Sequence, residues 1–266
     1  MTGVWEGKRV LVTGASSGIG AALAREMAAS GATVGICARR AQMLDEVLAD
    51  CRRTSPDSRA WTIDLAELDR LEGFVHRVED ELGGIDVLVN NAAVALGGPA
   101  ARMPWADLER VTELDYYSPI RLTHAALPGM LSNGWGRVVV ISSMAARMST
   151  PGEAAYAAAK AALSAYFEAL AGEMWDSVVR FHLVYPALID LTPGVDGPDD
   201  LASTTTGATV IPAPVLARDI RRQLESGDFE LYMPYAMRRA VAERAADVAK
   251  SIEFMAGWYQ RAGDHH

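Results

Sequence analysis

Short, mostly apolar runs alternate with segments of helical periodicity, and this alternation constrains the fold more than any other feature of the chain. The runs lie at residues 8–13, 33–37, 60–63, 85–90, 137–142, 179–185 and 229–233. The helical segments between them lie at residues 18–29, 41–53, 67–82, 105–131 and 153–177. Such apolar runs are typical of strands buried on both faces of a parallel sheet. The alternation therefore predicts right-handed βαβ units and an α/β fold with a doubly wound parallel sheet.

The chain length and two atypical segments indicate how the fold is organised. We expect the 266 residues to form a single domain over residues 1–266. The stretch 190–212 is rich in Gly, Pro and Thr, and a connection of this length is typical of a substrate lid. Residues 236–261 are amphipathic and predict a C-terminal helix, which we expect to pack on a partner subunit rather than on a membrane.

Composition and charge exclude several classes of function. Half of the residues are hydrophobic and the net charge is -9, so we expect a globular protein that repels nucleic acid and anionic membranes. We find no secretory signal and no apolar stretch long enough for stable membrane insertion, and Cys37 and Cys51 resemble reduced thiols. These features predict a cytoplasmic protein. The cysteines and histidines lack metal-ligand spacing, so no metal site is expected.

A glycine-rich turn, TGASSGIG at residues 13–20, follows the first predicted strand. Its glycines let the backbone approach a pyrophosphate, and the helix expected to begin near Gly18 would point free N–H groups at the anion. A turn of this kind could be structural, but its place between a strand and a helix favours nucleotide binding. The predicted phosphate-binding residues are Gly14, Ser16, Ser17, Gly18, Ile19 and Gly20.

The end of the second predicted strand bears on the choice of nucleotide. An acidic residue there would bind the ribose 2′-hydroxyl of NAD(H), whereas arginine suits the 2′-phosphate of NADP(H). Ala38 occupies the expected acidic position, and Arg39 and Arg40 follow it. An arginine fork can bind a phosphate through two hydrogen bonds, although these arginines could also be solvated side chains at a helix start. We expect NADP(H) rather than NAD(H) as the cofactor.

Polar residues also end the third and fourth predicted strands. Asp64 could accept a hydrogen bond from the adenine amino group, or it could cap the helix near Glu67. Asn91 is followed by the small Ala92, which leaves room for the adenosine half of a cofactor against the backbone. These residues and Leu65 fall on the same sheet edge as the glycines, so we predict that they bind the cofactor.

A tyrosine and a lysine lie four residues apart in EAAYAAAKAAL (153–163), so they share one face of a predicted helix. Ser143 follows the strand before this helix. Ser143 could hydrogen-bond a carbonyl oxygen while Tyr156 supplies a proton and hydride arrives from a nicotinamide. Lys160 favours the phenolate electrostatically and could bond the nicotinamide ribose. The alternative is a surface helix whose lysine faces water, because this spacing is common by chance.

The combined motifs resemble the short-chain dehydrogenase/reductase family over about residues 8 to 192. The segments that carry the resemblance are TGASSGIG, NNAA, the Ser143–Tyr156–Lys160 set and VYPALID. The resemblance implies one Rossmann-type domain with a seven-stranded parallel sheet. It also implies hydride transfer between NAD(P) and a small-molecule alcohol or carbonyl.

The same resemblance implies further contacts. Tyr156, Lys160, Pro186 and Ile189 would contact the cofactor, and the Ala38-Arg39 pattern resembles that of NADP(H)-preferring members. The family implies a homodimer or homotetramer, built from the helices near 105–131 and 153–177.

Several positions depart from the family's pattern. Ala93 replaces the usual glycine of NNAG, and Ala187 replaces the glycine that usually follows the proline. Leu191 then precedes Thr192, which puts the usual carboxamide contact in doubt. The largest departure is Asp115, which occupies the position of a catalytic-site asparagine that helps a water reach the lysine. We include Asp115 with the serine, tyrosine and lysine as the predicted catalytic residues.

Two functions stay open at this point. The first is an NADP(H)-dependent oxidoreductase that interconverts a carbonyl and an alcohol, and the second is a nucleotide-binding regulatory or scaffold protein of the same fold with little turnover. The retained serine, tyrosine and lysine favour the enzyme. A lipophilic substrate is expected, because several apolar side chains could line a pocket, although they could also be ordinary core. These are Leu96, Met144, Met148, Tyr185 and Leu188, together with the 190–212 loop.

Overall fold

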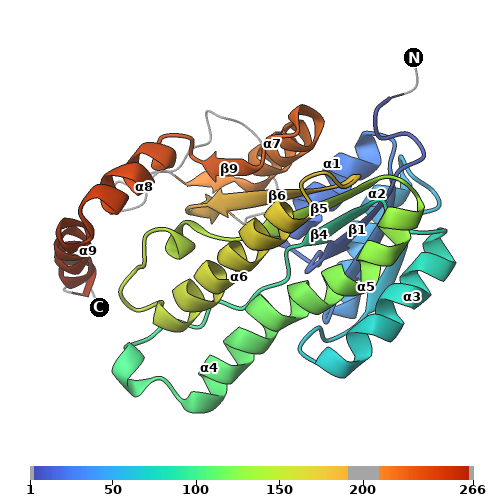
Figure 1. Cartoon of the computed structure of the whole chain (residues 1–266). Helices are drawn as coiled ribbons and strands as arrows, with labels where there is room; N and C mark the ends of the chain where they lie inside the picture. Colours follow the sequence, from blue (N-terminus) through green and yellow to red (C-terminus); the bar gives the residue numbers. More distant parts are fainter. Residues whose placement is uncertain (1–2, 191–209, 264–266) are drawn as a thin grey trace.

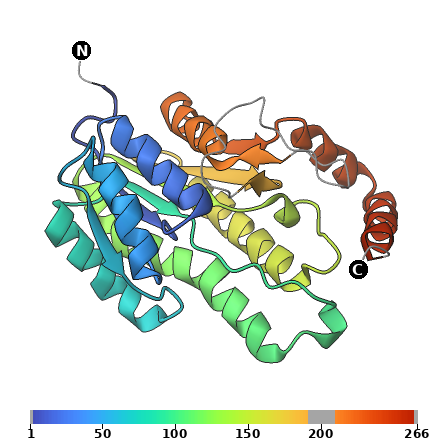
Figure 2. The same cartoon turned by 180° about the vertical axis from the view of Figure 1, so that it is seen from behind.

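A seven-stranded parallel sheet forms the centre of the protein. The computed structural model describes residues 3–190 and 210–263 (Figures 1 and 2). The strands are β1 (Arg9–Thr13), β2 (Thr33–Ala38), β3 (Arg59–Thr62), β4 (Val87–Asn90), β5 (Gly136–Ile141), β6 (Val179–Pro186) and β9 (Glu230–Met233). Their order is β3-β2-β1-β4-β5-β6-β9, so every predicted strand is present and the predicted doubly wound sheet is confirmed.

The strand order reverses between β1 and β4, and this position determines where a ligand can bind. The chain first builds outward from β1 to β2 and β3, and then returns to place β4 on the other side of β1. The loops that leave the carboxyl ends of β1 and β4 therefore diverge and open a crevice. In open α/β sheets this switch point is the usual ligand site.

Helices cover both faces of the sheet (Figures 1 and 2). One face packs against α1 (Gly18–Ala29), α2 (Ala41–Arg52) and α7 (Ala213–Ser226). The other packs against α3 (Leu71–Leu82), α5 (Ser118–Ser132) and α6 (Ala154–Glu173). Within β1, Val10 and Val12 join the first core and Leu11 joins the second. Both cores therefore draw on alternate residues of the same strands, and each such buried side chain contributes roughly 1.5–3 kcal/mol.

The predicted helix over 105–131 is interrupted in the structure. It consists of α4 (Trp105–Thr112), a π-helical turn at Glu113–Tyr117, and α5. A π turn holds one extra residue, which rotates everything beyond it relative to an uninterrupted helix. Asp115 lies in the middle of this turn, and its side chain points into the protein, where it is fully buried.

The C-terminal third differs from the prediction in two places. Helix α7 was not predicted, although a proline at Pro214 and a left-handed Gly227 mark its two ends. The single helix predicted over 236–261 is two helices, α8 (Met237–Ala246) and α9 (Val248–Gly263), separated at an extended Asp247. Over residues 3–190 and 210–263, no helix combines the length and apolarity required to cross a membrane.

Most of the predicted 190–212 lid, residues 191–209, lies outside the described residues. The two ends of this segment are paired. β7 (Ile189–Asp190) and β8 (Ile211–Pro212) form a separate two-stranded parallel sheet. The residues on the two sides of this segment therefore lie next to each other in space.

His182 in β6 makes the stability of the fold depend on pH. Its side chain is fully buried, Nδ1 lies 2.8 Å from the Asp228 carbonyl oxygen, and Nε2 has no hydrogen-bond partner in residues 3–190 and 210–263. Burial lowers the pKa of His182 from 6.5 to about 4. Between pH 4 and pH 6.5 the imidazole is protonated in the unfolded chain but neutral in the folded protein. The contribution of neutral His182 to the free energy of unfolding is therefore fully present above pH 6.5, and it is lost as the pH falls toward 4.

We expect the loss between pH 7 and pH 4 to be about 3 kcal/mol from this residue. The measurement is urea unfolding at several pH values for the natural protein and a His182→Met variant. Other groups titrate alike in both proteins, so the difference in pH slope isolates His182. If the free energy of unfolding changed with pH in the same way in both proteins, His182 would not be the source of the pH dependence.

Candidate active site

The glycine turn between β1 and α1 is shaped by close backbone contacts. Gly14 has a φ of +65°, and a Cβ at this position would lie 2.7 Å from the Ala92 Cα. A Cβ at Gly20 would lie 2.5 Å from the Asn91 Nδ2 and 2.7 Å from the Gly14 carbonyl oxygen. Helix α1 begins at Gly18, as predicted. The turn therefore needs glycine both for its conformation and for its approach to the loop after β4.

Thr13 fastens the glycine turn to the end of β4. Its hydroxyl donates to the Val89 carbonyl oxygen at 3.0 Å and accepts hydrogen bonds from the N–H groups of Asn91 and Ala92 at 2.9 and 3.0 Å. The Asn91 Nδ2 in turn donates to the Thr13 carbonyl oxygen at 2.8 Å. Asn91 thus stabilises the glycine turn by this hydrogen bond, and it also lines the pocket beside the turn. We did not predict Thr13, although a threonine before the first glycine was a readable signal.

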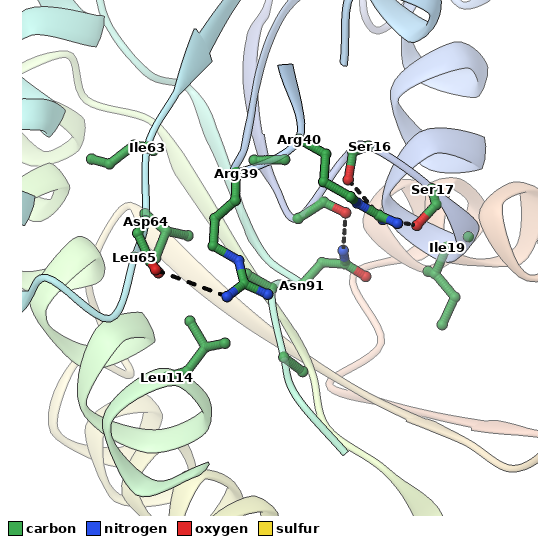
Figure 3. Close-up of a pocket in the computed structure, with 15 residues that line it drawn as sticks. Ser16, Ser17, Ile19, Arg39, Arg40, Ile63, Asp64, Leu65, Asn91 and Leu114 are labelled. Carbon is green, nitrogen blue, oxygen red and sulfur yellow. Dashed lines mark hydrogen bonds and ion pairs between the residues drawn. The ribbon is translucent and has the colours of Figure 1, made fainter. Parts of the chain in front are cut away.

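A pocket of about 270 Å³ opens at this switch point (Figure 3). Most of the predicted cofactor residues line it, namely Gly14, Ser16, Ser17, Gly18, Ile19, Arg39, Arg40, Asp64, Leu65, Asn91 and Ala92. Four further lining residues were not predicted: Ala38, Ile63, Ala93 and Leu114. Gly20 lies behind the turn, where it permits the contact with Asn91. The glycine cradle and the start of α1 are suited to a dinucleotide pyrophosphate.

The two arginines after β2 have different partners (Figure 3). Arg40 Nη2 donates to the hydroxyls of Ser16 and Ser17 at 3.0 and 2.7 Å. Arg39 Nη1 lies 3.8 Å from Asp64 Oδ2, and both side chains are substantially exposed. An exposed ion pair of this length is worth about 0–1 kcal/mol, so Arg39 can exchange Asp64 for a phosphate at little cost.

Lys160 does not face water, so the surface-helix alternative is wrong. Its side chain is buried in α6, and Nζ donates to the Ile141 carbonyl oxygen at 3.1 Å. Nζ also lies 5.6 Å from the centre of the Tyr156 ring. The helix therefore brings a cation and a phenol together at the end of β5.

The two serines after β5 have separate environments. Ser142 is buried, and its hydroxyl bonds with the Ser164 hydroxyl at 2.8 Å and with the Lys160 carbonyl oxygen. Ser143 is partly exposed and caps the short 3-10 helix η4 (Met144–Ala146), accepting a hydrogen bond from the Ala145 N–H at 3.1 Å. Ser142 is thus committed to joining β5 and α6, whereas the Ser143 hydroxyl proton is not used in these contacts.

Asp115 completes the surroundings of Lys160. One carboxylate oxygen accepts a hydrogen bond from the Val94 N–H at 2.8 Å, and the other lies 3.5 Å from Lys160 Nζ with no hydrogen-bond partner among the residues that the structure describes. Burial raises the pKa of Asp115, and the neighbouring Lys160 opposes that shift. The π turn between α4 and α5 thus places a buried carboxyl group beside the lysine.

The remaining predicted residues lie outside the pocket. Pro186 is buried at the end of β6, and Ile189 is half-buried in β7. The Ala187 N–H donates to the Met233 carbonyl oxygen at 2.8 Å. Tyr185 was expected among the substrate-lining side chains, but it is fully buried and stacks on Tyr232, so it belongs to the core.

No cluster of histidine, cysteine, aspartate or glutamate side chains suited to a metal ion occurs within the described part of the chain.

Comparison with known proteins agrees with this arrangement. The family model for short chain dehydrogenase matches residues 8–198. The chain belongs to the short chain dehydrogenase family. Members of this family are oxidoreductases that act on alcohol or carbonyl groups, and their Rossmann-type fold binds NAD(P)(H).

Individual short chain dehydrogenases resemble this protein over much of its length. It is 35% identical over 207 residues to a short chain dehydrogenase of Pseudocercospora fijiensis, covering 77% of this chain and 66% of that protein. It is 36% identical over 200 residues to a fatty acyl-CoA reductase of Mycobacterium tuberculosis, covering 72% of this chain and 68% of that protein. The chain thus spans about two thirds of the length of these curated relatives.

The fold agreement extends to a solved structure. A short-chain dehydrogenase from Streptomyces avermitilis superimposes with a TM-score of 0.78 at 28% identity, covering 96% of this chain and 97% of that one.

Proposed function

We propose that the protein is an NADP(H)-dependent oxidoreductase that interconverts a carbonyl and an alcohol on a lipophilic small molecule. The observation that carries the proposal is the buried Lys160, held beside Tyr156 and Asp115 on the sheet edge that also carries the dinucleotide pocket. A buried cation next to a phenol is costly for a purely structural role, because burial disfavours the charge.

The residues have complementary roles in this reaction. When bound, the nicotinamide supplies or accepts the hydride. Tyr156 gives a proton to the carbonyl oxygen during reduction, or takes it from the alcohol during oxidation. Ser143 donates a hydrogen bond that polarises the same oxygen, and the Lys160 cation stabilises negative charge on the phenol oxygen.

The arginines support the preference for NADP(H) over NAD(H). Arg39 and Arg40 both line the pocket, and Ala38 leaves no carboxylate at the end of β2 to repel a 2′-phosphate. Arg39 is held only by a long ion pair. A phosphate bound here would accept charge-assisted hydrogen bonds from Arg39.

A lipophilic substrate is supported by the apolar residues beyond the phenol. Met144 and Met148 belong to the core next to Ser143, and Val94 and Leu96 belong to a smaller apolar cluster with Ala155 and Ala159 of α6. The fatty acyl-CoA reductase relative is named for a lipophilic substrate, which agrees with this character.

An assembly of two or four copies completes the proposal. An apolar groove of about 440 Å³ lies between α4 and α6, and it includes exposed Trp105 and Tyr117. Large exposed aromatic side chains beside an alanine-rich helix are typical of a subunit interface. These are the helices that the family resemblance assigns to the contact.

The test of the function is a reduction assay that distinguishes the enzyme from a regulatory or scaffold protein. NADPH or NADH oxidation is followed with ketones, aldehydes and 3-oxoacyl thioesters of increasing chain length. We expect turnover with at least one class, faster with NADPH and with longer chains. Tight NADPH binding without turnover on any class would favour the regulatory alternative instead.

Replacement of Arg39 by alanine is expected to weaken NADPH binding much more than NADH binding. Only NADPH has the 2′-phosphate, and loss of one charge-assisted pair should cost about 1.5–3 kcal/mol, or roughly tenfold to 150-fold in affinity. Fluorescence titration gives both dissociation constants. Arg25→Ala removes an arginine that is ion-paired to Asp50 outside the pocket, and it should change neither. Equal losses for the two cofactors in Arg39→Ala would refute the assignment.

Asp115 should displace the pH dependence of catalysis. Ionised beside Lys160, it disfavours negative charge on the Tyr156 oxygen, so the natural protein should need a higher pH for alcohol oxidation than an Asp115→Asn variant. Carbonyl reduction, which needs the protonated phenol, should persist further into the basic range.

The measurement is a pair of pH–rate profiles for the natural protein and Asp115→Asn, with a deuterated cofactor to confirm that hydride transfer is rate-limiting. The alternative is that Asp115 acts only through its backbone, with its side chain serving the Val94 N–H. A basic limb that does not move, or that moves upward in the variant, would reject the electrostatic role of Asp115.

A further inference from the structure

Arg147 shares one tight turn with Ser143. Ser143 caps η4, and the Arg147 N–H closes the same turn on the Met144 carbonyl oxygen at 3.0 Å. The Ala146 N–H bonds with the Ser143 carbonyl oxygen at 3.0 Å. These hydrogen bonds join Ser143 and Arg147 within one short turn, so we expect a group that holds Arg147 to hold Ser143 as well.

The Arg147 side chain is held by three separate elements. Its Nη2 donates to Tyr185 Oη in β6 at 2.6 Å, to Glu230 Oε1 in β9 at 3.0 Å, and to Glu168 in α6. The guanidinium also lies 4.7 Å from the centre of the Tyr185 ring. All three acceptors surround the one Nη2 nitrogen, whereas the buried Nε has no hydrogen-bond partner within the described part of the chain.

The acceptors of Arg147 are themselves fixed by the core. Tyr185 is fully buried and stacks on Tyr232, with 4.8 Å between ring centres and 17° between planes. The Tyr232 hydroxyl donates to Glu230 at 3.1 Å. Arg147 is therefore anchored to Tyr185, near the carboxyl end of β6, and to Glu230, the first residue of β9.

We propose that Arg147 is a positioning residue, which holds the Ser143 turn in place against Tyr185 of β6, Glu230 of β9 and Glu168 of α6. This inference rests on the proposed function, because positioning presupposes that Ser143 acts on a substrate oxygen. A displacement of about 1 Å in a reacting group can cost 10²-fold in rate. Arg147 does not line the dinucleotide pocket, so its loss should leave cofactor affinity unchanged.

The test compares Arg147→Met with a matched control, Arg221→Met. Arg221 in α7 also bridges two carboxylates, Glu26 at 2.7 Å and Glu225 at 2.5 Å, and its side chain is about as exposed as that of Arg147 (23% against 25%). We expect Arg147→Met to lower kcat by about 10-fold to 100-fold with NADPH affinity within about twofold. Arg221→Met should leave both unchanged. Equal effects on kcat would overturn the inference.

A double-mutant cycle with Ser143→Ala separates positioning from general destabilisation. If Arg147 acts through Ser143, Arg147→Met should cost less than about threefold once Ser143 is already alanine. An undiminished loss would overturn the inference while leaving the proposed function intact. If Arg147→Met does not fold, Arg147→Lys and Tyr185→Phe enter the same cycle, since each removes part of the contact.

Hydrogen exchange gives a readout that needs no turnover. The amides of residues 144–148 should exchange about tenfold faster in Arg147→Met than in the natural protein, and Arg221→Met should leave them unchanged. Unchanged exchange in Arg147→Met would overturn the inference. A natural protein without activity on any carbonyl, but with this exchange pattern, would instead reject the proposed function alone.

Discussion

Replacement of Tyr156 by phenylalanine is expected to lower turnover by about 10²–10⁴-fold while NADPH binding stays within about twofold. The phenol hydroxyl supplies the proton, whereas the dinucleotide pocket is lined by the glycine turn and by the ends of β2, β3 and β4. The ring itself stays, so Lys160 keeps its neighbour and the buried surface changes little. Steady-state rates and a fluorescence titration of NADPH measure the two quantities on the same protein.

A second tyrosine of α6 provides the control. Tyr166 lies further along the helix, and its hydroxyl is 2.5 Å from His124 Nε2. Tyr166→Phe removes a hydroxyl from the same helix without touching Lys160, and its turnover should stay within about threefold of the natural protein. Activity of Tyr156→Phe within tenfold of the natural protein would exclude a general acid role.

Replacement of Lys160 by methionine should abolish most turnover and also destabilise the fold. Methionine has a similar length, so packing is largely kept, but Asp115 loses the cation 3.5 Å away and stays fully buried. Removing one partner of a buried pair typically costs about 3–5 kcal/mol. The cost should be smaller at low pH, because the unpaired Asp115 can then be protonated, and it should grow as the pH rises.

The double variant Lys160→Met/Asp115→Asn distinguishes the loss of turnover from the loss of stability. A neutral amide leaves no unpaired charge, so we expect most of the lost stability to return and the pH dependence of the loss to vanish. Turnover should stay low, because the cation beside Tyr156 is still absent. Denaturant unfolding and kcat are measured on all four proteins. A double variant as unstable as Lys160→Met would show that Asp115 is not the cause.

The parts of the fold that could be predicted are those encoded by local patterns. The strands were recognised because the sheet is covered on both faces, which leaves continuous apolar runs. The glycine turn was recognised because its conformation at Gly14 and its contact with Ala92 tolerate no side chain. The pairing of Tyr156 with Lys160 on one face follows from helical spacing alone.

Features that depend on distant contacts were not predictable in the same way. Asp115 was expected near Lys160 only by analogy, because its burial depends on a π turn that periodicity does not reveal. Tyr185 was predicted to line the substrate pocket, because an aromatic side chain at a strand end can line a pocket or pack in the core. Its burial is decided by Arg147 and Tyr232, which lie far from it in the sequence.

The π turn between α4 and α5 has a consequence for how this protein can diversify. One additional residue shifts helical phase by about 100°, so the apolar sides of α4 and α5 face different neighbours. Leu122, Ala126 and Met130 of α5 pack on the sheet, whereas Val111 of α4 packs against Ala155 and Ala159 of α6. The exposed surface of α4 can therefore change without requiring α5 to rotate on the sheet. We therefore expect substitutions on the exposed side of α4 to leave the Asp115 carboxylate in its place beside Lys160.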